Sequence, residues 1–176
     1  SGDLGEIQLV RANRMEPVSK LGQKHPEESE LLWQIRNFPR FFWVSGGLFV
    51  EMTIHQIDEV CWLMDDWPQT AHGIGGRAPS SRDRSQNLDS HSIEYTFRDG
   101  AKALVSARYL RKCHNEFATF VHGRERAAQF SGHIHAGTVR TYRDHRVNTD
   151  NLDWEAEKEI LTPWQAEWKV FLEAIR

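Results

Sequence analysis

The chain has 176 residues, 39% of them hydrophobic, with seven Trp and nine Phe, a size and composition that fit one domain with a packed core. The formal net charge is −3 at pH 7 and no long basic run is present, which argues against nucleic acid as a partner. No apolar run is long enough to span a bilayer and no signal peptide is recognisable, so we expect a cytoplasmic protein that does not contact membranes. Cys61 and Cys113 are too few for a disulfide scaffold, and we expect both thiols to be reduced.

The first half of the chain is mainly helical in pattern. We expect a strand at residues 5–12, a loop at 17–26, and helices at 27–38 and 47–65. Pro26 and the acidic residues after it favour a helix start, because acids are stabilised near the positive end of the helix dipole. The helix at 47–65 has no Gly or Pro in its interior, which favours several uninterrupted turns.

The second half changes from helical spacing to the alternation that is typical of strands. We expect strands at residues 92–98, 101–110, 117–121, 127–130 and 139–142. Asp99-Gly100 and the segment 122–125 are expected hairpin turns. Helices followed by hairpin-linked strands predict an α+β fold with an antiparallel sheet.

A final helix is indicated by Thr162 as N-cap, with Pro163 and Gln165 in the first turn. Its apolar face carries Trp164, Trp168, Phe171, Leu172 and Ile175. The expected strand 101–110 is apolar on both faces, and helices can cover only one of them. We therefore expect a homo-oligomer, a symmetric dimer or a multiple of one, in which a second copy covers the other face.

The helix expected at 47–65 carries two rows of residues at helical spacing. The apolar row consists of Val50, Ile54, Ile57, Cys61 and Met64. The second row follows it one residue later and consists of Glu51, His55, Asp58 and Trp62. We therefore expect the ionisable side chains to lie directly beside a buried stripe, with little of this helix exposed.

Glu51 and His55 are a candidate catalytic pair. Four residues apart on a helix, they can hydrogen-bond, and the carboxylate can hold the imidazole in one tautomer. An imidazole titrates with a pKa of about 6.5, which suits proton transfer at neutral pH. The same spacing is typical of a structural His–carboxylate pair, and the pattern alone leaves both interpretations open. Gly46 and Gly47 lack a Cβ and would let substrate and cofactor approach the backbone closely.

This segment resembles the central motif of the glucose–fructose oxidoreductase / inositol dehydrogenase (Gfo/Idh/MocA) family. The residues that carry the resemblance are Gly46-Gly47, Glu51, His55 and Asp58, followed by Trp62-Leu63 and Pro68. Segments 5–7, 71–77, 99–100 and 164–176 resemble family elements in the same order. The resemblance implies a large, mostly antiparallel open sheet with helices on one face, the other face often being used for self-association.

The resemblance also implies roles. His55 would accept or return the proton of a substrate hydroxyl while a hydride moves to or from a nicotinamide. Glu51 stands where many members have Asp, and Asp58 matches a position that reaches a substrate hydroxyl or fixes the helix. The family's catalytic Lys, in a Glu-Lys-Pro segment of the nucleotide-binding domain, has no counterpart here. We therefore expect residues 1–176 to be a single substrate-binding and oligomerisation domain of a longer polypeptide, without the N-terminal dinucleotide-binding domain.

Two apparent cofactor signals carry less weight. Residues 73–78 fit G-x-G-x-x-A but lack the preceding strand and following helix of a dinucleotide fingerprint, so we expect a glycine-rich strand and no cofactor binding there. Glu51 and His55 could face a zinc ion together with His91 or the pair His133 and His135. No metal-ligand motif supports this reading, and we expect no metal.

Several side chains outside the helix are candidates for contacting substrate. Trp33, Trp43 and Arg40 could wall a sugar pocket, although core packing explains them equally well. Arg14 and Arg108 are expected near strand ends, where they could meet polar substrate groups, although a solvated arginine is the simpler account. We retain Asp58, Trp43 and Arg14 as candidate substrate-binding residues.

Together these patterns predict the substrate-binding domain of a nicotinamide-dependent oxidoreductase that acts on a sugar, polyol or derivative. NAD or NADP would be bound by the full-length protein, with His55 and Glu51 as catalytic residues of this domain. Two alternatives remain open: an NAD-dependent glycoside hydrolase of the same family, and a non-catalytic carbohydrate-binding or assembly module.

We expect the isolated chain 1–176 to bind neither NAD(H) nor NADP(H), because its glycine cluster at 73–78 stands in the wrong context for a dinucleotide. Titration calorimetry with each cofactor measures this directly. Binding at micromolar affinity would contradict the proposed division between two domains.

Overall fold

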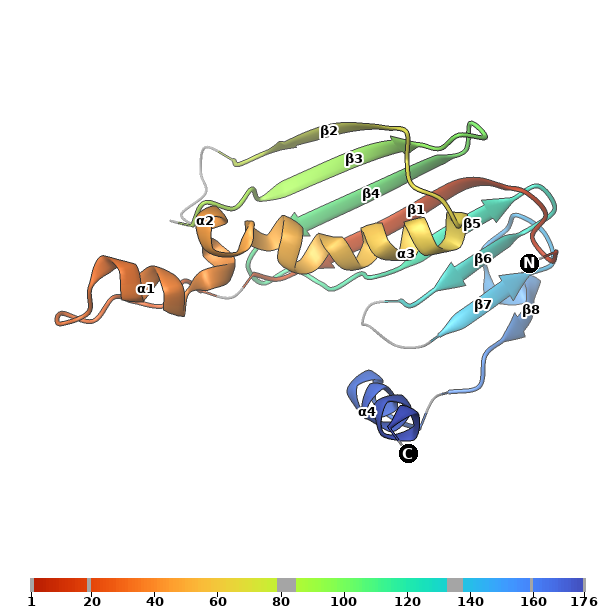
Figure 1. Ribbon diagram of the computed structural model, residues 1–176. Coiled ribbons are helices and arrows are strands. Elements are labelled where there is room, and N and C mark those ends of the chain that lie inside the picture. Colours follow the sequence, from red (N-terminus) through yellow and green to blue (C-terminus); the bar gives the residue numbers. More distant parts are fainter. Residues whose placement is uncertain (1, 19, 79–84, 133–137, 159, 176) are drawn as a thin grey trace.

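The computed structural model describes residues 2–18, 20–78, 85–132, 138–158 and 160–175. An eight-stranded sheet of order β2-β3-β4-β1-β5-β6-β7-β8 dominates the fold (Figure 1). The strands are β1 (Ile7–Glu16), β2 (Thr70–Gly76), β3 (Ser90–Thr96), β4 (Lys102–Tyr109), β5 (Thr119–Gly123), β6 (Ala127–Phe130), β7 (Val139–Tyr142) and β8 (Leu152–Glu155). The β1–β4 pair is parallel and the other neighbouring strands are antiparallel. The expected α+β class and mostly antiparallel open sheet are confirmed.

The helices are short except for two. They are α1 (Glu30–Arg36), α2 (Phe42–Ser45), α3 (Ile54–Met64) and α4 (Pro163–Ala174), with 3-10 turns at Phe38–Arg40 and Thr149–Asn151. A π-helical turn, Phe49–Thr53, leads directly into α3. We call the continuous helical segment from Leu48 to Met64 the motif helix. It lies across one face of the sheet (Figure 1).

Local sequence signals placed most elements correctly. The Thr162–Gln165 capping box is present at the start of α4, and Ser29 caps α1 by accepting a hydrogen bond from Leu32. The first strand is longer than expected and runs to Glu16, and the short edge strand β8 was missed. β8 has four residues of mixed polarity, which gives too little alternation to identify a strand.

The core lies between the sheet and the motif helix. Val10, Val105 and Val121 come from neighbouring strands and are fully buried, and Val60 of the motif helix packs against them. Strand register explains this, because Val10 is level with Ala103 on one side and Val121 on the other, so their side chains share one sheet face. Burying each such side chain contributes about 1.5–3 kcal/mol, which fixes the helix on this face.

The expected buried stripe of the motif helix is only partly met, because Ile57 and Met64 pack against the core whereas its first two residues are turned outward. Val50 and Ile54 are 49% and 44% exposed, whereas Thr53, Gln56 and Val60 are buried against the sheet. Thr53 is buried here because it finds polar partners on the strands, 38 and 56 residues away in the sequence. The sequence of the helix alone cannot show such partners. The expectation that little of this helix is exposed is therefore wrong.

The last helix, α4, lies apart from the motif helix and below the sheet in the view of Figure 1. None of its described residues is buried, and its apolar residues Trp164, Trp168, Phe171, Leu172 and Ile175 are all exposed. Within the described parts of the chain, no helix combines the length and apolar character needed to cross a membrane.

The sheet face turned away from the motif helix is mixed in character, so the expectation that strand 101–110 is apolar on both faces is only partly met. Leu104 is 38% exposed, while Lys102 on the same strand bonds Glu94 at 3.0 Å. Nearby, the guanidinium of Arg11 lies 5.3 Å above the centre of the Phe120 ring. This face offers apolar contact area among paired charges, a composition that suits a specific interface.

We still expect a homodimer, or a multiple of one, formed through this outer face. Leu104→Glu should shift the protein toward the monomer, because it places a charge in the interface. Arg11, the register partner of Leu104 on β1, can pair with the new carboxylate in the monomer, so the variant should still fold. Light scattering at high protein concentration measures the state, with Leu31→Glu on the exposed surface of α1 as a control. A wild-type protein that stays monomeric would contradict the expectation.

Candidate functional site

The two sides of the motif helix have different surroundings. Thr53 is fully buried against the sheet, whereas His55, two residues later, is exposed. Two residues correspond to about 200° of rotation on an α-helix, so the two side chains point in nearly opposite directions. Glu51, half-buried, and Asp58, exposed, lie within about 60° of His55 by the same geometry. The structure therefore brings the three candidate motif residues onto one face, away from the sheet.

The glycine pair before the motif helix is required by the fold. Gly46 and Gly47 have φ angles of 78° and 71°, in the left-handed region that disfavours other residues. A Cβ at Gly47 would lie 2.4 Å from the amide oxygen of Asn87 and 2.5 Å from the Phe42 ring. The space expected for substrate and cofactor is thus occupied by protein side chains. Asn87 in turn accepts a hydrogen bond from the backbone of Leu48 and fixes the start of the helix.

Arg14 reaches the motif helix from the end of β1. Its side chain is buried, its Nη2 donates to the sulfur of Met52 at 3.5 Å, and it lies 4.3 Å from the centre of the Phe117 ring. Its Nε also bonds Glu16 at 3.3 Å. The simpler reading of Arg14 as a solvated side chain is therefore wrong. Arg14 thus contacts the motif helix at Met52, the residue before Thr53.

A cavity of about 370 Å³ opens beside this arginine, between the end of β1, the Phe38–Arg40 turn and the motif helix. Leu48 and Met52 line it from the motif helix, and Glu16, Lys20, Arg36 and Arg40 contribute charged groups. Arg36 is paired with Glu28 at 2.7 Å, whereas Arg40 is almost completely buried. Cavities of roughly this size, with a few charged groups, are typical of small-molecule sites. We call it the charged cavity.

The tryptophans have structural contacts outside the charged cavity. Trp43 of α2 is 57% exposed, and its indole donates to the side chain of Gln34 at 2.6 Å. Trp33 packs edge-on against Phe41, and its indole donates to the carbonyl of Gly22 at 2.7 Å. Trp33 is thus a packing residue, while Trp43 is tied to α1 and presents its ring to solvent.

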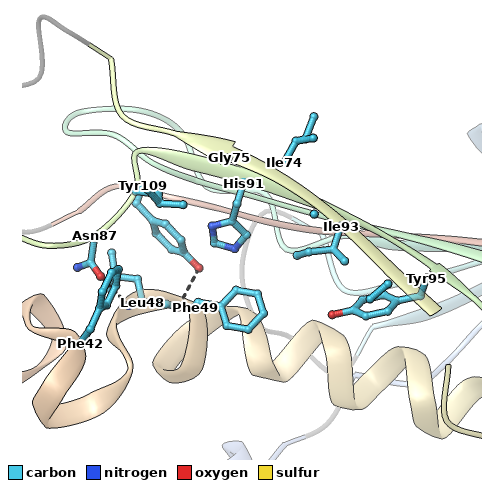
Figure 2. A pocket seen from close by; sticks show the side chains of 13 residues that line it. Phe42, Leu48, Phe49, Ile74, Gly75, Asn87, His91, Ile93, Tyr95 and Tyr109 are labelled. Atoms are coloured by element: carbon cyan, nitrogen blue, oxygen red, sulfur yellow. Dashed lines mark hydrogen bonds between the residues drawn. The ribbon is translucent and has the colours of Figure 1, made fainter. Parts of the chain in front are cut away.

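A buried polar network on the sheet side of the motif helix was not expected from the sequence. Thr53 Oγ1 lies 2.9 Å from Nε2 of His91 and 2.7 Å from the hydroxyl of Tyr109. The Tyr109 hydroxyl also donates to the carbonyl of Leu48 (Figure 2). Burial lowers the pKa of His91 and raises the pKa of Tyr109 to about 12, so both are neutral at pH 7. The only sequence signal for this network is the polar residue Thr53, which stands between the apolar residues Met52 and Ile54.

This placement argues against the zinc alternative. His91 bonds the sheet-facing Thr53, whereas His55 is on the opposite side of the helix, so the two imidazoles cannot share an ion. Searching the described residues finds no group of three or more His, Cys, Asp or Glu side chains arranged to hold a metal. His133 and His135 lie outside the described residues.

The glycine-rich segment does not have the context of a dinucleotide fingerprint. Gly73, Gly75 and Gly76 belong to the extended edge strand β2, which pairs with β3 along its whole length. A fingerprint requires instead a tight turn from a strand into a helix N-terminus. The interpretation of this segment as a glycine-rich strand is confirmed.

Comparison with known proteins establishes the family. Residues 1–129 match the GFO/IDH/MocA C-terminal domain, and the chain belongs to this family. A search among curated proteins found no match. The resemblance that the motif indicated is therefore confirmed over most of the chain.

Several solved structures share the fold. UDP-N-acetylglucosamine 3-dehydrogenase GnnA from Acidithiobacillus ferrooxidans has a TM-score of 0.63 and 17% identity, and the match covers 98% of this chain and 46% of that one. WlbA dehydrogenase from Bordetella pertussis, in complex with NADH and UDP-GlcNAcA, has a TM-score of 0.64 and 15% identity, and the match covers 99% of this chain and 45% of that one. A super-repressor mutant of Gal80p from Saccharomyces cerevisiae has a TM-score of 0.71 and 11% identity, and the match covers 99% of this chain and 45% of that one. The chain thus spans a little under half the length of these proteins.

One further group on the motif helix titrates abnormally. Glu59 is half-buried, one turn after His55, and accepts a hydrogen bond from Thr119 at 2.5 Å. Burial raises the pKa of its carboxyl, and the hydrogen bond opposes this in part. Because the pKa is higher in the folded state than in the unfolded one, the protonated carboxyl favours folding at low pH. This contribution is lost as the pH rises through the folded-state pKa.

We therefore expect Glu59→Gln to gain stability relative to the wild type as the pH rises above the ordinary glutamate pKa of about 4.3 and through the raised folded-state pKa. Urea denaturation at several pH values measures the difference in unfolding free energy. The matched control is Glu157→Gln, at an exposed position, which should show little dependence on pH. A Glu59→Gln difference that is the same at every pH would contradict the role of burial.

Proposed function

We propose that the chain is the substrate-binding domain of an NAD(P)-dependent oxidoreductase that acts on a sugar, polyol or derivative, with His55 as general acid/base. The observation that carries this proposal is the orientation of the motif helix. Packing against the sheet leaves Glu51, His55 and Asp58 together on the face of the helix that is turned away from the sheet. The charged cavity is lined by Leu48 and Met52 of the same helix. Membership of the family and the dehydrogenase names of two structural relatives support the same chemistry.

His55 would remove the proton from a substrate hydroxyl during oxidation and return it during reduction. The nicotinamide, when bound, would accept or supply the accompanying hydride. Since β2 lacks the turn and helix N-terminus that would bind a dinucleotide, we propose that the cofactor is held by a separate domain of the full-length protein. Glu51, one turn before His55, would orient the imidazole by a hydrogen bond.

Three further residues are proposed to contact the substrate. Asp58 follows His55 on the same exposed face and can accept a hydrogen bond from a hydroxyl. Arg14 is buried between Glu16 and Met52, two residues that line the charged cavity, and its positive charge suits a polar or anionic substituent there. Trp43 offers an exposed aromatic ring at the approach to the motif helix, suited to stacking on the apolar face of a sugar.

A non-catalytic module is the second candidate. The observation in its favour is the likeness to Gal80p, described as a super-repressor mutant, whose TM-score of 0.71 exceeds those of GnnA and WlbA. The two proposals differ in what they require of His55. A module tolerates its replacement, whereas an oxidoreductase loses turnover.

We expect His55→Asn in the full-length enzyme to lower kcat by about 10²–10⁴, the usual contribution of a positioned general base. Cofactor affinity and thermal stability should stay near wild-type values, because His55 is exposed. Glu51→Gln should have a smaller effect, because it keeps the shape and loses only the charge. Turnover is followed as reduced-nicotinamide absorbance with a panel of sugars and polyols, and product analysis distinguishes oxidation from glycoside cleavage.

The control is Asp150→Asn, at an exposed position in the Thr149–Asn151 turn, which should leave kcat unchanged. Loss of activity by His55→Asn only in proportion to unfolded protein would favour a structural role. Wild-type protein that binds sugars yet turns none over would favour the module.

A further inference from the structure

A second cavity, of about 450 Å³, lies between the start of the motif helix and the sheet (Figure 2). Strands β2, β3 and β4 form one wall, and the segment from Phe42 to Phe49 forms the other. His91 and Tyr109, the partners of Thr53, line it from the sheet. Because Thr53 and His55 point in nearly opposite directions, this cavity is on the side of the helix that the proposed chemistry does not use.

The wall formed by β2 is unusually flat. The residues of β2 that face the helix side are Ala71, Gly73 and Gly75, as their pairing with Tyr95, Ile93 and His91 shows. These residues carry at most a methyl group, so the backbone around Gly73 is exposed to the cavity, whereas Leu88 and His91 cover the same side of Gly75. Aromatic rings of Phe42, Phe49 and Tyr95 stand around this surface. The result is a slot between a smooth strand and aromatic side chains.

The chemistry of the lining disfavours charged and hydroxyl-rich ligands. Among the described residues that line the cavity, none is Asp, Glu, Lys or Arg. The amide of Asn87 is engaged with Pro39 and Leu48, and the Tyr109 hydroxyl and His91 Nε2 are engaged with Thr53. A sugar buried here would leave several hydroxyls without partners, at about 1–3 kcal/mol each. A flat apolar ring meets no such cost.

We propose that this slot, lined by Gly73, Phe49 and Tyr95, is a binding site for an uncharged planar aromatic ring. Its volume lies within the range of about 300–1,000 Å³ found for small-molecule sites. A ring lying on the peptide plane at Gly73 would have Leu88 and His91 at the Gly75 end of the slot and Phe49 across from it, so that both of its faces would be covered. The site requires neither a nicotinamide nor His55, so it stands independently of the proposed oxidoreductase function.

Glycine positions in β2 provide a matched pair of variants. A Cβ at Gly73 would point toward Ile93 and come no closer than 3.9 Å to its Cγ1, so Gly73→Val fits the strand and fills the slot. A Cβ at Gly76 has no atom within 4 Å, and Gly76 is outside the lining of the cavity. Valine favours strands, so neither variant should impair folding.

The experiment titrates indole into the full-length protein and both variants, with calorimetry and saturation-transfer NMR as readouts. We expect wild type and Gly76→Val to bind indole with affinities within about twofold of each other, and Gly73→Val to bind at least about tenfold more weakly, since the valine occupies the ring's place. myo-Inositol, a hydroxylated ring of similar size, should not displace indole from the slot.

Three results would overturn the proposal. The first is no indole binding to the wild type at millimolar concentration. The second is equal binding to all three proteins, which would place indole on other exposed apolar surfaces such as α4. The third is displacement of indole by myo-inositol in both the wild type and Gly76→Val. Loss of turnover in His55→Asn has no bearing on any of these outcomes.

Discussion

The hydroxyl of Thr53 holds the motif helix in one rotation about its axis. This side chain is fully buried and lies between His91 of β3 and Tyr109 of β4, at 2.9 Å and 2.7 Å. A hydroxyl can donate one hydrogen bond and accept others, so one atom ties the helix to two strands. Each bond contributes about 0.5–1.5 kcal/mol, and a buried partner left unsatisfied costs about 1–3 kcal/mol. A rotated helix would lose these bonds and expose Val60.

This constraint gives the helix two functional sides. The polar contacts of Thr53 turn Glu51, His55 and Asp58 away from the sheet, where an exposed imidazole can meet a substrate. On the sheet side they leave an apolar slot next to β2. Leu48 and Tyr109 line both this slot and the charged cavity, so these two side chains are shared between them. A ligand in one cavity therefore touches residues that also border the other.

Local sequence patterns predicted those parts of the fold that depend on neighbouring residues. Strand alternation placed β3, β4 and β7, and the Thr162–Gln165 capping box placed the start of α4, because both signals are complete within a few residues. The motif likewise gave the helix and its candidate pair Glu51 and His55, although the roles of the pair remain proposals.

The rest depends on residues far apart in the chain. The rotation of the motif helix is set by Thr53 and its strand partners, and its own apolar residues indicate it only in part, since Val50 and Ile54 are exposed. From the sequence, Arg14 is most simply a solvated surface residue, whereas in the structure it contacts Met52, 38 positions away. The glycine pair was assigned to ligand approach, whereas Asn87 and Phe42 occupy the space beside Gly47. Such contacts leave no pattern within one element.

The most direct test of the account is a structure of the full-length protein with its cofactor and a sugar substrate bound. The account predicts that a ring nitrogen of His55 lies about 2.6–3.2 Å from the substrate hydroxyl that is oxidised, the usual reach of a general base. It also predicts that Thr53 still bridges His91 and Tyr109. A substrate bound with no contact to His55, or a motif helix rotated so that Thr53 leaves the sheet, would contradict it.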